Sequence, residues 1–314
     1  SIPHVHSREP LWDDPDLARS VAAGEQYLPN APTGGRETIV TSPIRAIPQY
    51  VVQMPGPGWM HVAAAVFTAA TFLLLTVKIV IPAIVCAVLA IASCLCWVWT
   101  IDKGPDKGPV DIGGGYTLPV YVTGRMAHGY WAMIVLWIVA GSIFLSYVFS
   151  YLYLWTGSPE VWLAGRKYLS NIAWPTASAV LLVTGLALYK AAVVVLPERG
   201  KRNVRAPVLV AAGASALVAA IVIEFYGHWQ AGLRPMESSY GAMVFMGGIL
   251  SAQIIAAIVI MSGFVIARLA AGMVDKVRWA SLENTNLLVW YVVGQALLGL
   301  VLIHGFPHVM GAAP

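Results

Sequence analysis

Seven histidines are the first candidates for chemistry in this chain of 314 residues, because imidazole is the commonest protein ligand of metal ions and also ligates haem. A haem with two axial histidines needs them on different helices at one depth of the membrane. His61 and His128 fall near one end of their apolar runs, whereas His228, His304 and His308 fall near the opposite end. We therefore favour imidazoles that reach solvent at the two membrane surfaces, and a haem or metal site at either end is the alternative.

Glu224 is the second candidate, since it is the one acidic residue set inside an apolar run, AIVIEFYGHW. Ionisable residues inside membrane segments mark functional sites by default. His228 follows one helical turn later, so the two side chains share a face of the expected helix. The pattern predicts a local ion pair of Glu224 and His228 at the membrane surface, with proton handling by the pair as the alternative.

Two glutamines, Gln253 and Gln295, fall near the middles of the last two apolar runs, which begin near Tyr240 and Thr285. Counted at about 1.5 Å per residue, both lie near the midplane of a hydrocarbon core of roughly 30 Å. A buried amide in lipid needs a polar partner, and helices joined by a short loop are antiparallel neighbours. We expect the two amides to form an interhelical polar pair.

The remaining polar patterns do not support catalysis. Cys86, Cys94 and Cys96 lie in one apolar run, and a Cys-x-Cys pair lacks the spacing and additional ligands of a zinc site. The glycines from Gly113 to Gly115 follow no predicted strand and precede no Gly-Lys-Ser/Thr, so they do not indicate a phosphate-binding loop. We expect no catalytic residue, no cofactor site and no metal site in this chain, and no nucleic-acid partner.

The composition indicates an integral membrane protein. Apolar residues make up 58% of the chain and charged residues 11%, whereas soluble domains have roughly 25% charged residues. The mean hydropathy is +0.72. The run from His128 to Trp155 contains no Asp, Glu, Lys or Arg, and at about 1.5 Å per residue it would form a helix of roughly 40 Å, enough to cross a bilayer. Tyr and Trp gather at both its ends, as is typical of the membrane interface.

Polar, apolar and Gly/Pro-rich runs divide the chain into four segments. Residues 1–57 are a polar, proline-rich cytoplasmic tail, which we expect to be an extended arm on a partner; solvated disorder is the alternative. Residues 58–100 suit a hairpin of two membrane helices, and residues 101–127 form a cytoplasmic loop. Residues 128–314 hold five further spans. The predicted fold class is therefore an all-α membrane protein with seven transmembrane helices.

Small residues punctuate two of the last five spans and predict close helix packing there, Gly213, Gly247 and Gly248 among them. The last five spans are expected near His128 to Trp155, Ile172 to Val195, Pro207 to Tyr226, Tyr240 to Ala267 and Thr285 to Ile303.

Lysine and arginine predict the orientation. Of the 19 basic residues, fifteen fall on the side of the N-terminus when seven spans are assumed. The other four are Lys78, Arg166, Lys167 and Arg234. The positive-inside rule then places the N-terminus in the cytoplasm and the C-terminus on the outer, periplasmic side of a bacterial cytoplasmic membrane.

Six motifs, taken together, resemble subunit III of haem–copper cytochrome c oxidases. In chain order they are VHSREPLW (Val5 to Trp12), RETIVTSP (Arg36 to Pro43), VDIGGGYTLPVY (Val110 to Tyr121), SYLYLW (Ser150 to Trp155), SSYGAMVF (Ser238 to Phe245) and WYVVGQALLGLVLIHGFPH (Trp290 to His308). The closest resemblance is to the subunit III half of bacterial fused subunit I+III chains, and the first two motifs resemble the tail that follows subunit I there. The chain would then be part of such a fusion or its split product. The order, the spacing and the seven-span count carry the resemblance over nearly the whole length.

The resemblance implies a two-helix hairpin and a five-helix bundle, separated by a V-shaped cleft that holds phospholipid. It implies a non-catalytic core subunit of an aerobic respiratory oxidase, which stabilises the catalytic subunit and supports proton uptake and oxygen reduction. Enzyme activity would belong to the proton-translocating complex, with haem and copper in partner subunits I and II. Membership of a respiratory supercomplex is left open. The tail would contact subunit I, with Leu11, Trp12 and Tyr27 as anchors.

Two positions depart from that family. Most members carry an acid in the third helix, and alignment on SYLYLW puts Ala140 there, which cannot hold a proton. The usual Trp-His-Phe-Val-Asp of the last helix is replaced by Trp290 to Gly294. Both departures argue against a proton antenna through these helices and leave the structural role.

Two other function classes compete with an oxidase subunit. A b-type cytochrome membrane anchor needs paired histidines at one depth. A small-solute transporter needs broken helices and polar clusters at the midplane, where only Gln253 and Gln295 qualify.

Overall fold

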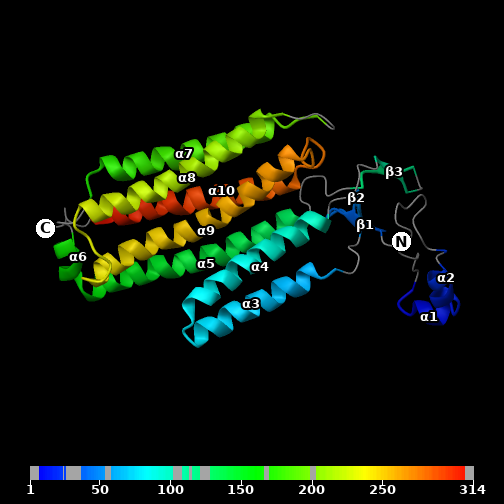
Figure 1. Cartoon of the computed structure of the whole chain (residues 1–314), viewed down its shortest axis with the longest axis horizontal. Helices are drawn as coiled ribbons and strands as arrows, with labels where there is room; N and C mark the ends of the chain where they lie inside the picture. The colour runs from blue at the N-terminus through cyan, green and yellow to red at the C-terminus, as the bar shows by residue number, and fades with distance from the viewer. Residues whose placement is uncertain are drawn as a thin grey trace. The chain divides into compact units, whose positions relative to one another are not determined.

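The computed structural model of the chain divides into two compact units, Ser1–Thr123 and Gly124–Pro314 (Figure 1). Apolar helices make up much of both units. The structure describes residues 7–23, 25, 37–53, 58–101, 108–112, 115–120, 128–165, 170–198 and 203–307.

Within the described residues, six helices are long and apolar enough to cross a membrane, so the protein is a mostly helical, multi-pass membrane protein. They are α4 (Val80–Ile101), α5 (His128–Gly157), α7 (Ala173–Val194), α8 (Arg205–Gln230), α9 (Ser239–Ala270) and α10 (Ala280–Leu300). The first of the seven predicted spans is shorter, because α3 (Met60–Thr76) has 17 residues, about 25 Å of helix.

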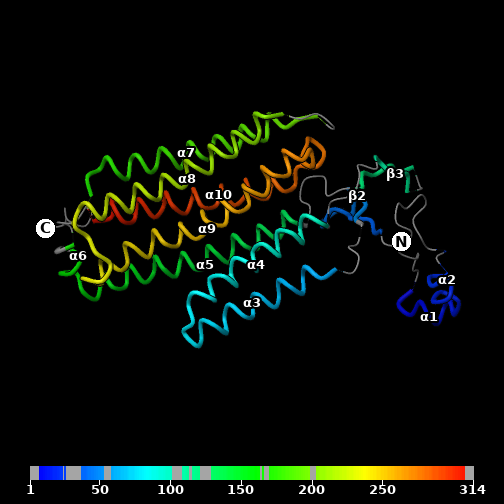
Figure 2. The backbone as a smooth tube through the Cα atoms, in the orientation of Figure 1, coloured from blue at the N-terminus to red at the C-terminus, as the bar shows by residue number. Residues whose placement is uncertain are grey.

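Helices α3 and α4 form a hairpin (Figure 2). Lys78 lies in the turn between them. Lys78 has a φ of 62°, a left-handed conformation that ends α3, and the Ile79 N–H donates to the Leu74 carbonyl at 2.9 Å. The two helices pack on each other, yet many of their apolar side chains are exposed, Phe72 at 65% and Ile81 at 77%. Within its own unit, the hairpin therefore leaves much of its apolar surface uncovered.

The proline-rich tail and the loop after α4 contain strands, which our sequence analysis did not predict. The strands are β1 (Glu37–Thr41), β2 (Pro48–Gln53), β3 (Val110–Asp111) and β4 (Thr117–Leu118). β1 pairs with β2 and β3 with β4, both antiparallel, and the Val51 N–H donates to the Pro119 carbonyl at 2.9 Å. β-branched residues favour strands here, and the one proline inside a strand is its first residue.

Two short helices, α1 (Pro10–Asp13) and α2 (Leu17–Ala23), also lie in the tail. Pro10 stands in the first turn of α1, where its missing N–H leaves no hydrogen bond unmade. The most buried side chains of the strands are Tyr50 and Val51, both 1% exposed. The tail thus forms local structure with a very small core of its own.

The second unit is a helical bundle in which α7 packs on α8, α8 on α9, and α10 on α5, α7 and α9 (Figure 1). Glycine permits a close approach of α8 to α7, because a Cβ at Gly213 would lie 2.9 Å from the Tyr189 ring and 3.3 Å from the Gly185 carbonyl oxygen. The Tyr189 hydroxyl shares a hydrogen bond with Ser262 of α9. The prediction that small residues bring these helices together is confirmed at Gly213.

Helix α5 carries three exposed serines, Ser142, Ser146 and Ser150, one turn apart. Each hydroxyl donates to the backbone carbonyl four residues earlier, at 2.8 to 2.9 Å. The hydroxyl donors on this face are therefore satisfied inside the helix itself.

One end of the bundle is formed by the loops after α7 and α9. The Lys276 N–H donates to the Pro197 carbonyl at 3.0 Å and so joins the two loops. Between α9 and α10, the Asp275 carboxylate accepts hydrogen bonds from the backbone N–H groups of Val277 and Arg278 and pairs with the Arg278 guanidinium at 2.8 Å. This pair fixes the turn that leads into α10.

The opposite end of the bundle contains α6 (Pro159–Gly165) and the π-helical turn η2 (Val301–Gly305), which continues α10. Trp162 of α6 packs edge-on against Tyr151 of α5 and Tyr240 of α9. A cluster of aromatic side chains therefore closes this end, where Glu224, His228 and His304 are also buried.

Candidate functional site

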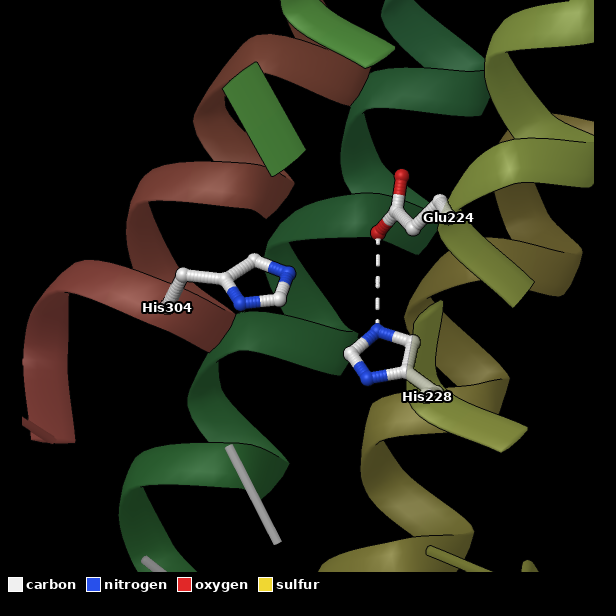
Figure 3. Close-up of side chains that lie close together, drawn as sticks. All are labelled: Glu224, His228 and His304. Carbon is white, nitrogen blue, oxygen red and sulfur yellow. Dashed lines mark ion pairs between the residues drawn. The ribbon is translucent and has the colours of Figure 1, made fainter. Parts of the chain in front are cut away.

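Helix α8 places Glu224 and His228 on one face, because residues four apart in a helix lie one above the other. Glu224 Oε1 and His228 Nε2 are 3.9 Å apart (Figure 3). The two residues are 6% and 3% exposed. Our prediction of a pair at the membrane surface is corrected in one respect, since the pair forms but is buried inside the bundle.

His304 of η2 completes the cluster from a second helix, and its imidazole points toward the other two side chains (Figure 3). The His228 and His304 rings are stacked, with centroids 5.1 Å apart and planes 6° from parallel. One ligand atom from each of the three side chains lies within 4.8 Å of the others. We call Glu224, His228 and His304 the Glu–His–His cluster.

The surroundings of the cluster are apolar and aromatic. Phe245 of α9 lies 6.0 Å from His228 between ring centroids, and Ile303, next to His304, is 1% exposed. Gly247 makes room nearby, because a Cβ there would contact both Tyr147 and Ile303. The Tyr147 hydroxyl donates to the Met243 carbonyl at 3.0 Å. A carboxylate held among such groups has lost most of its hydration and needs a compensating positive charge.

The chemistry open to the cluster is cation binding or proton sharing. His228 Nε2 is buried and has no hydrogen-bond partner among the described residues, although it faces the carboxylate at ion-pair distance. Two imidazolium ions stacked at 5.1 Å would repel each other in apolar surroundings. One proton or one metal ion shared by the three side chains avoids that repulsion.

The burial of His304 is what sequence reasoning missed. The sequence placed His228 and His304 near the same end of the membrane but interpreted both as imidazoles that reach solvent, whereas the structure buries them at 3% and 8% exposure. Depth follows from counting residues along the helix, but the direction in which His304 points depends on the π-helical turn that carries it. The shared depth of the two histidines was the available signal.

The predicted pair of Gln253 and Gln295 is also corrected. The Gln295 side chain donates to Ser251 Oγ at 3.3 Å and accepts a hydrogen bond from the Tyr291 hydroxyl at 2.6 Å. Gln253 is exposed on α9. Positions two residues apart point about 200° away from each other around a helix, so Ser251 and Gln253 cannot both face α10. Gln295 therefore meets α9 at Ser251, two residues from Gln253, and the predicted partner was wrong.

The other predicted positions have simple surroundings. Leu11 and Trp12, the proposed anchors of the tail, are 61% and 86% exposed, and Tyr27 lies outside the described residues. Ala140 is partly exposed on α5. His61 packs on Trp97 within the α3–α4 hairpin, with ring centroids 5.6 Å apart.

Some histidines considered from the sequence cannot be placed. His4, His6 and His308 lie outside the described residues, as does the side chain of His128. The Glu–His–His cluster is therefore the site that the described part of the chain offers. Neither the protein-family models nor the curated proteins include a match to this chain.

Proposed function

We propose that the chain is a non-catalytic membrane subunit of a haem–copper oxidase of the subunit III type. The observation that carries the proposal is the order of the six sequence motifs along a multi-pass membrane protein. Subunit I would be its main protein partner and subunit II a further one. The haem and copper of the oxidase would be in these partner subunits. The chain would stabilise subunit I and support proton uptake and oxygen reduction there.

The motif SSYGAMVF has a structural reason at each of its key positions. Ser238 caps α9, since its hydroxyl accepts a hydrogen bond from the Gly241 N–H at 3.0 Å. Gly241 leaves space for the Arg234 carbonyl, which a Cβ would strike, and Tyr240 is 2% exposed. These features support the interpretation that the motif determines where α9 begins.

The proposal includes seven membrane crossings, with α3 as the first, and a bound phospholipid beside the α3–α4 hairpin. The exposed apolar side chains of the hairpin would face hydrocarbon in the bilayer, and the acyl chains of a bound phospholipid would supply such surroundings. The 17 residues of α3 span less than a hydrocarbon core of roughly 30 Å, which local thinning of the bilayer accommodates.

The exposed tail side chains Leu11 and Trp12 would contact subunit I at the cytoplasmic face of a bacterial inner membrane. Ala140 offers no proton on α5, which favours a stabilising role over a proton antenna in this helix. The stacked arrangement of His228 and His304 disfavours the rival b-type cytochrome, because bis-histidine haem ligation puts the imidazoles on opposite sides of a porphyrin.

Purification of the native complex in mild detergent tests the proposal. We expect the chain to co-purify with haem and copper in stoichiometric amounts, and the separated chain to lack haem absorption. When the chain is removed, the rate of oxygen consumption by the complex should decline faster with time. Purification of the chain in a complex that lacks haem and copper would contradict the proposal, as would haem absorption in the separated chain.

A further inference from the structure

We propose that the Glu–His–His cluster binds a single zinc ion, which clamps the π-helical end of α10 to α8. The site would link the two helices and would be independent of any redox centre. It replaces our expectation from the sequence that the chain contains no metal site.

The donor set fits zinc. Two imidazole nitrogens and one carboxylate oxygen are ligands that Zn²⁺ accepts in proteins, in the combination of two histidines and one glutamate. Ca²⁺ and Mg²⁺ prefer sites made of oxygen ligands, so a set with two nitrogens disfavours them. Glu224 and His228 lie one turn apart on α8 and can therefore chelate from one helix face, while His304 reaches the same point from η2.

The distances require only a small adjustment. Zinc binds nitrogen and oxygen ligands at about 2.0 to 2.2 Å, which places neighbouring ligand atoms of a tetrahedron roughly 3.4 Å apart. Glu224 Oε1 and His228 Nε2 are already 3.9 Å apart, and the set of three lies within 4.8 Å. The imidazole planes of His228 and His304, now 6° from parallel, would have to reorient so that both lone pairs point at one ion, and the fourth position would take a water molecule.

Burial supplies the second argument. Each of the three residues is less than nine per cent exposed, so the carboxylate has little water to compensate its charge. The buried Nε2 of His228 faces that carboxylate and makes no hydrogen bond within the described chain. A divalent cation between these groups would stabilise the carboxylate and accept the lone pairs of both imidazoles, which bind metals in their neutral form.

The π-helical turn at His304 is an independent observation. Five residues, Val301–Gly305, leave the α-helical hydrogen-bonding pattern just where the chain contributes its ligand. Such turns are rare and occur frequently at functional sites. Because the turn changes the direction of the side chains that follow α10, it brings His304 into line with α8.

Zinc binding to the intact, purified chain tests the proposal, after any affinity tag is removed and bound metal is stripped with a chelator. We expect one high-affinity Zn²⁺ per chain by elemental analysis after equilibration with ZnCl₂. X-ray absorption at the zinc edge should show two imidazoles and one carboxylate oxygen. Zn²⁺ should also raise the unfolding temperature.

Substitutions of the ligands sharpen the test. We expect His304→Ala and His228→Ala each to weaken zinc binding at least about 100-fold, since loss of even an outer-shell partner costs 10- to 100-fold. His304→Gln keeps a polar side chain of similar size and should lose zinc in the same way, with helical content by circular dichroism unchanged. His61→Ala is the matched control, because His61 belongs to the α3–α4 hairpin and stands outside the cluster.

The carboxylate has a matched control as well. Glu224→Gln should weaken zinc binding, whereas Glu237→Gln, at an exposed acid after α8, should not. Zinc affinity that is equal in the wild type and in the folded His304→Gln and His228→Ala variants would overturn the proposal, as would an absorption spectrum without imidazole ligands. The isolated chain can show zinc binding whether or not it assembles with an oxidase, so the two proposals fail separately.

Discussion

The α3–α4 hairpin and the bundle of the second unit are built from equally apolar helices but are stabilised in different ways. In the hairpin, large side chains such as Phe72 and Ile81 are mostly exposed. In the bundle, polar groups such as Ser262, Gln295 and the Glu–His–His cluster are buried, and each lies against a polar partner on another helix. Hydropathy cannot distinguish the two regions. The difference shows that buried polar contacts and close-packed glycines specify the bundle. The stability of the hairpin depends instead on the lipid or protein that covers its exposed apolar side chains.

A large effect should come from filling the close contact of α8 with α7 at Gly213. Gly213→Val would push side-chain atoms into the Tyr189 ring and the Gly185 carbonyl, and we expect it to lower the free energy of unfolding by about 3 kcal/mol. Gly263→Val is the control, because a Cβ at Gly263 meets nothing within 4 Å. Equilibrium unfolding in mixed micelles measures both. Equal effects would show that the contact is not tight in solution.

A slightly smaller loss in the free energy of unfolding should follow when the turn before α10 loses the negative charge of Asp275. Asp275→Asn removes charge-assisted hydrogen bonds from Arg278, and we expect a loss of about 2 kcal/mol. Unfolding of the variant at neutral pH measures this loss. Asp111→Asn in the first unit is the comparison and should have a smaller effect, since Asp111 is exposed.

The same residue predicts a pH dependence. Burial alone would raise the pKa of Asp275, but the hydrogen bonds and charge of Arg278 and the Val277 N–H outweigh it and hold that pKa below the usual aspartate range. The stabilisation is therefore complete above the pKa of an unfolded aspartate and is lost as the pH falls through the lower, folded value. Unfolding curves below about pH 4 should separate the wild type from Asp275→Asn progressively less. A difference that grows on acidification would contradict this.

The polar contact between α9 and α10 should have a modest effect. We expect a coupling free energy of about 0.6 kcal/mol between Ser251→Ala and Gln295→Leu in a double-mutant cycle, as is average for hydrogen bonds inside membrane proteins. Gln253→Leu replaces the exposed amide and should show no coupling to Gln295→Leu. Coupling through Gln253 instead would restore the pairing that we first predicted.

The smallest effect on unfolding should come from the hairpin. Phe72→Ala removes an exposed ring, and we expect a change within about 0.5 kcal/mol for the chain in detergent. Leu217→Ala, at a fully buried position of the bundle, should cost about 2 to 5 kcal/mol. Comparable losses at the two positions would show that the hairpin is covered within the isolated chain.

Much of the helical framework could be predicted from the sequence, because long apolar runs determine where membrane helices begin and end. The predicted span from Ile172 to Val195 matches α7 (Ala173–Val194) to within one residue at each end. Gly213 was recognised as a packing position because a small residue in an apolar helix has few roles other than close helix packing. In each case, one local property of the sequence was enough.

Rotation around the helix axis could not be predicted in the same way. Gln295 selects Ser251 instead of Gln253, and His304 joins His228 through a π-helical turn, and neither choice has a local sequence signal. The β1–β2 hairpin was missed for a related reason, since frequent prolines suggested an extended arm, whereas the β-branched residues between them favour paired strands. These features depend on contacts between segments distant in sequence.

The serines of α5 show that a polar residue need not carry a polar surface into a bilayer. Ser142, Ser146 and Ser150 each turn their hydroxyl proton back to a carbonyl of their own helix. A residue transfer scale assigns each of these serines the desolvation cost of a free hydroxyl. The hydrogen bond within the helix already offsets most of that cost. In its solvation energy, this face of α5 therefore behaves more like a row of alanines than its sequence suggests, and it can tolerate hydrocarbon.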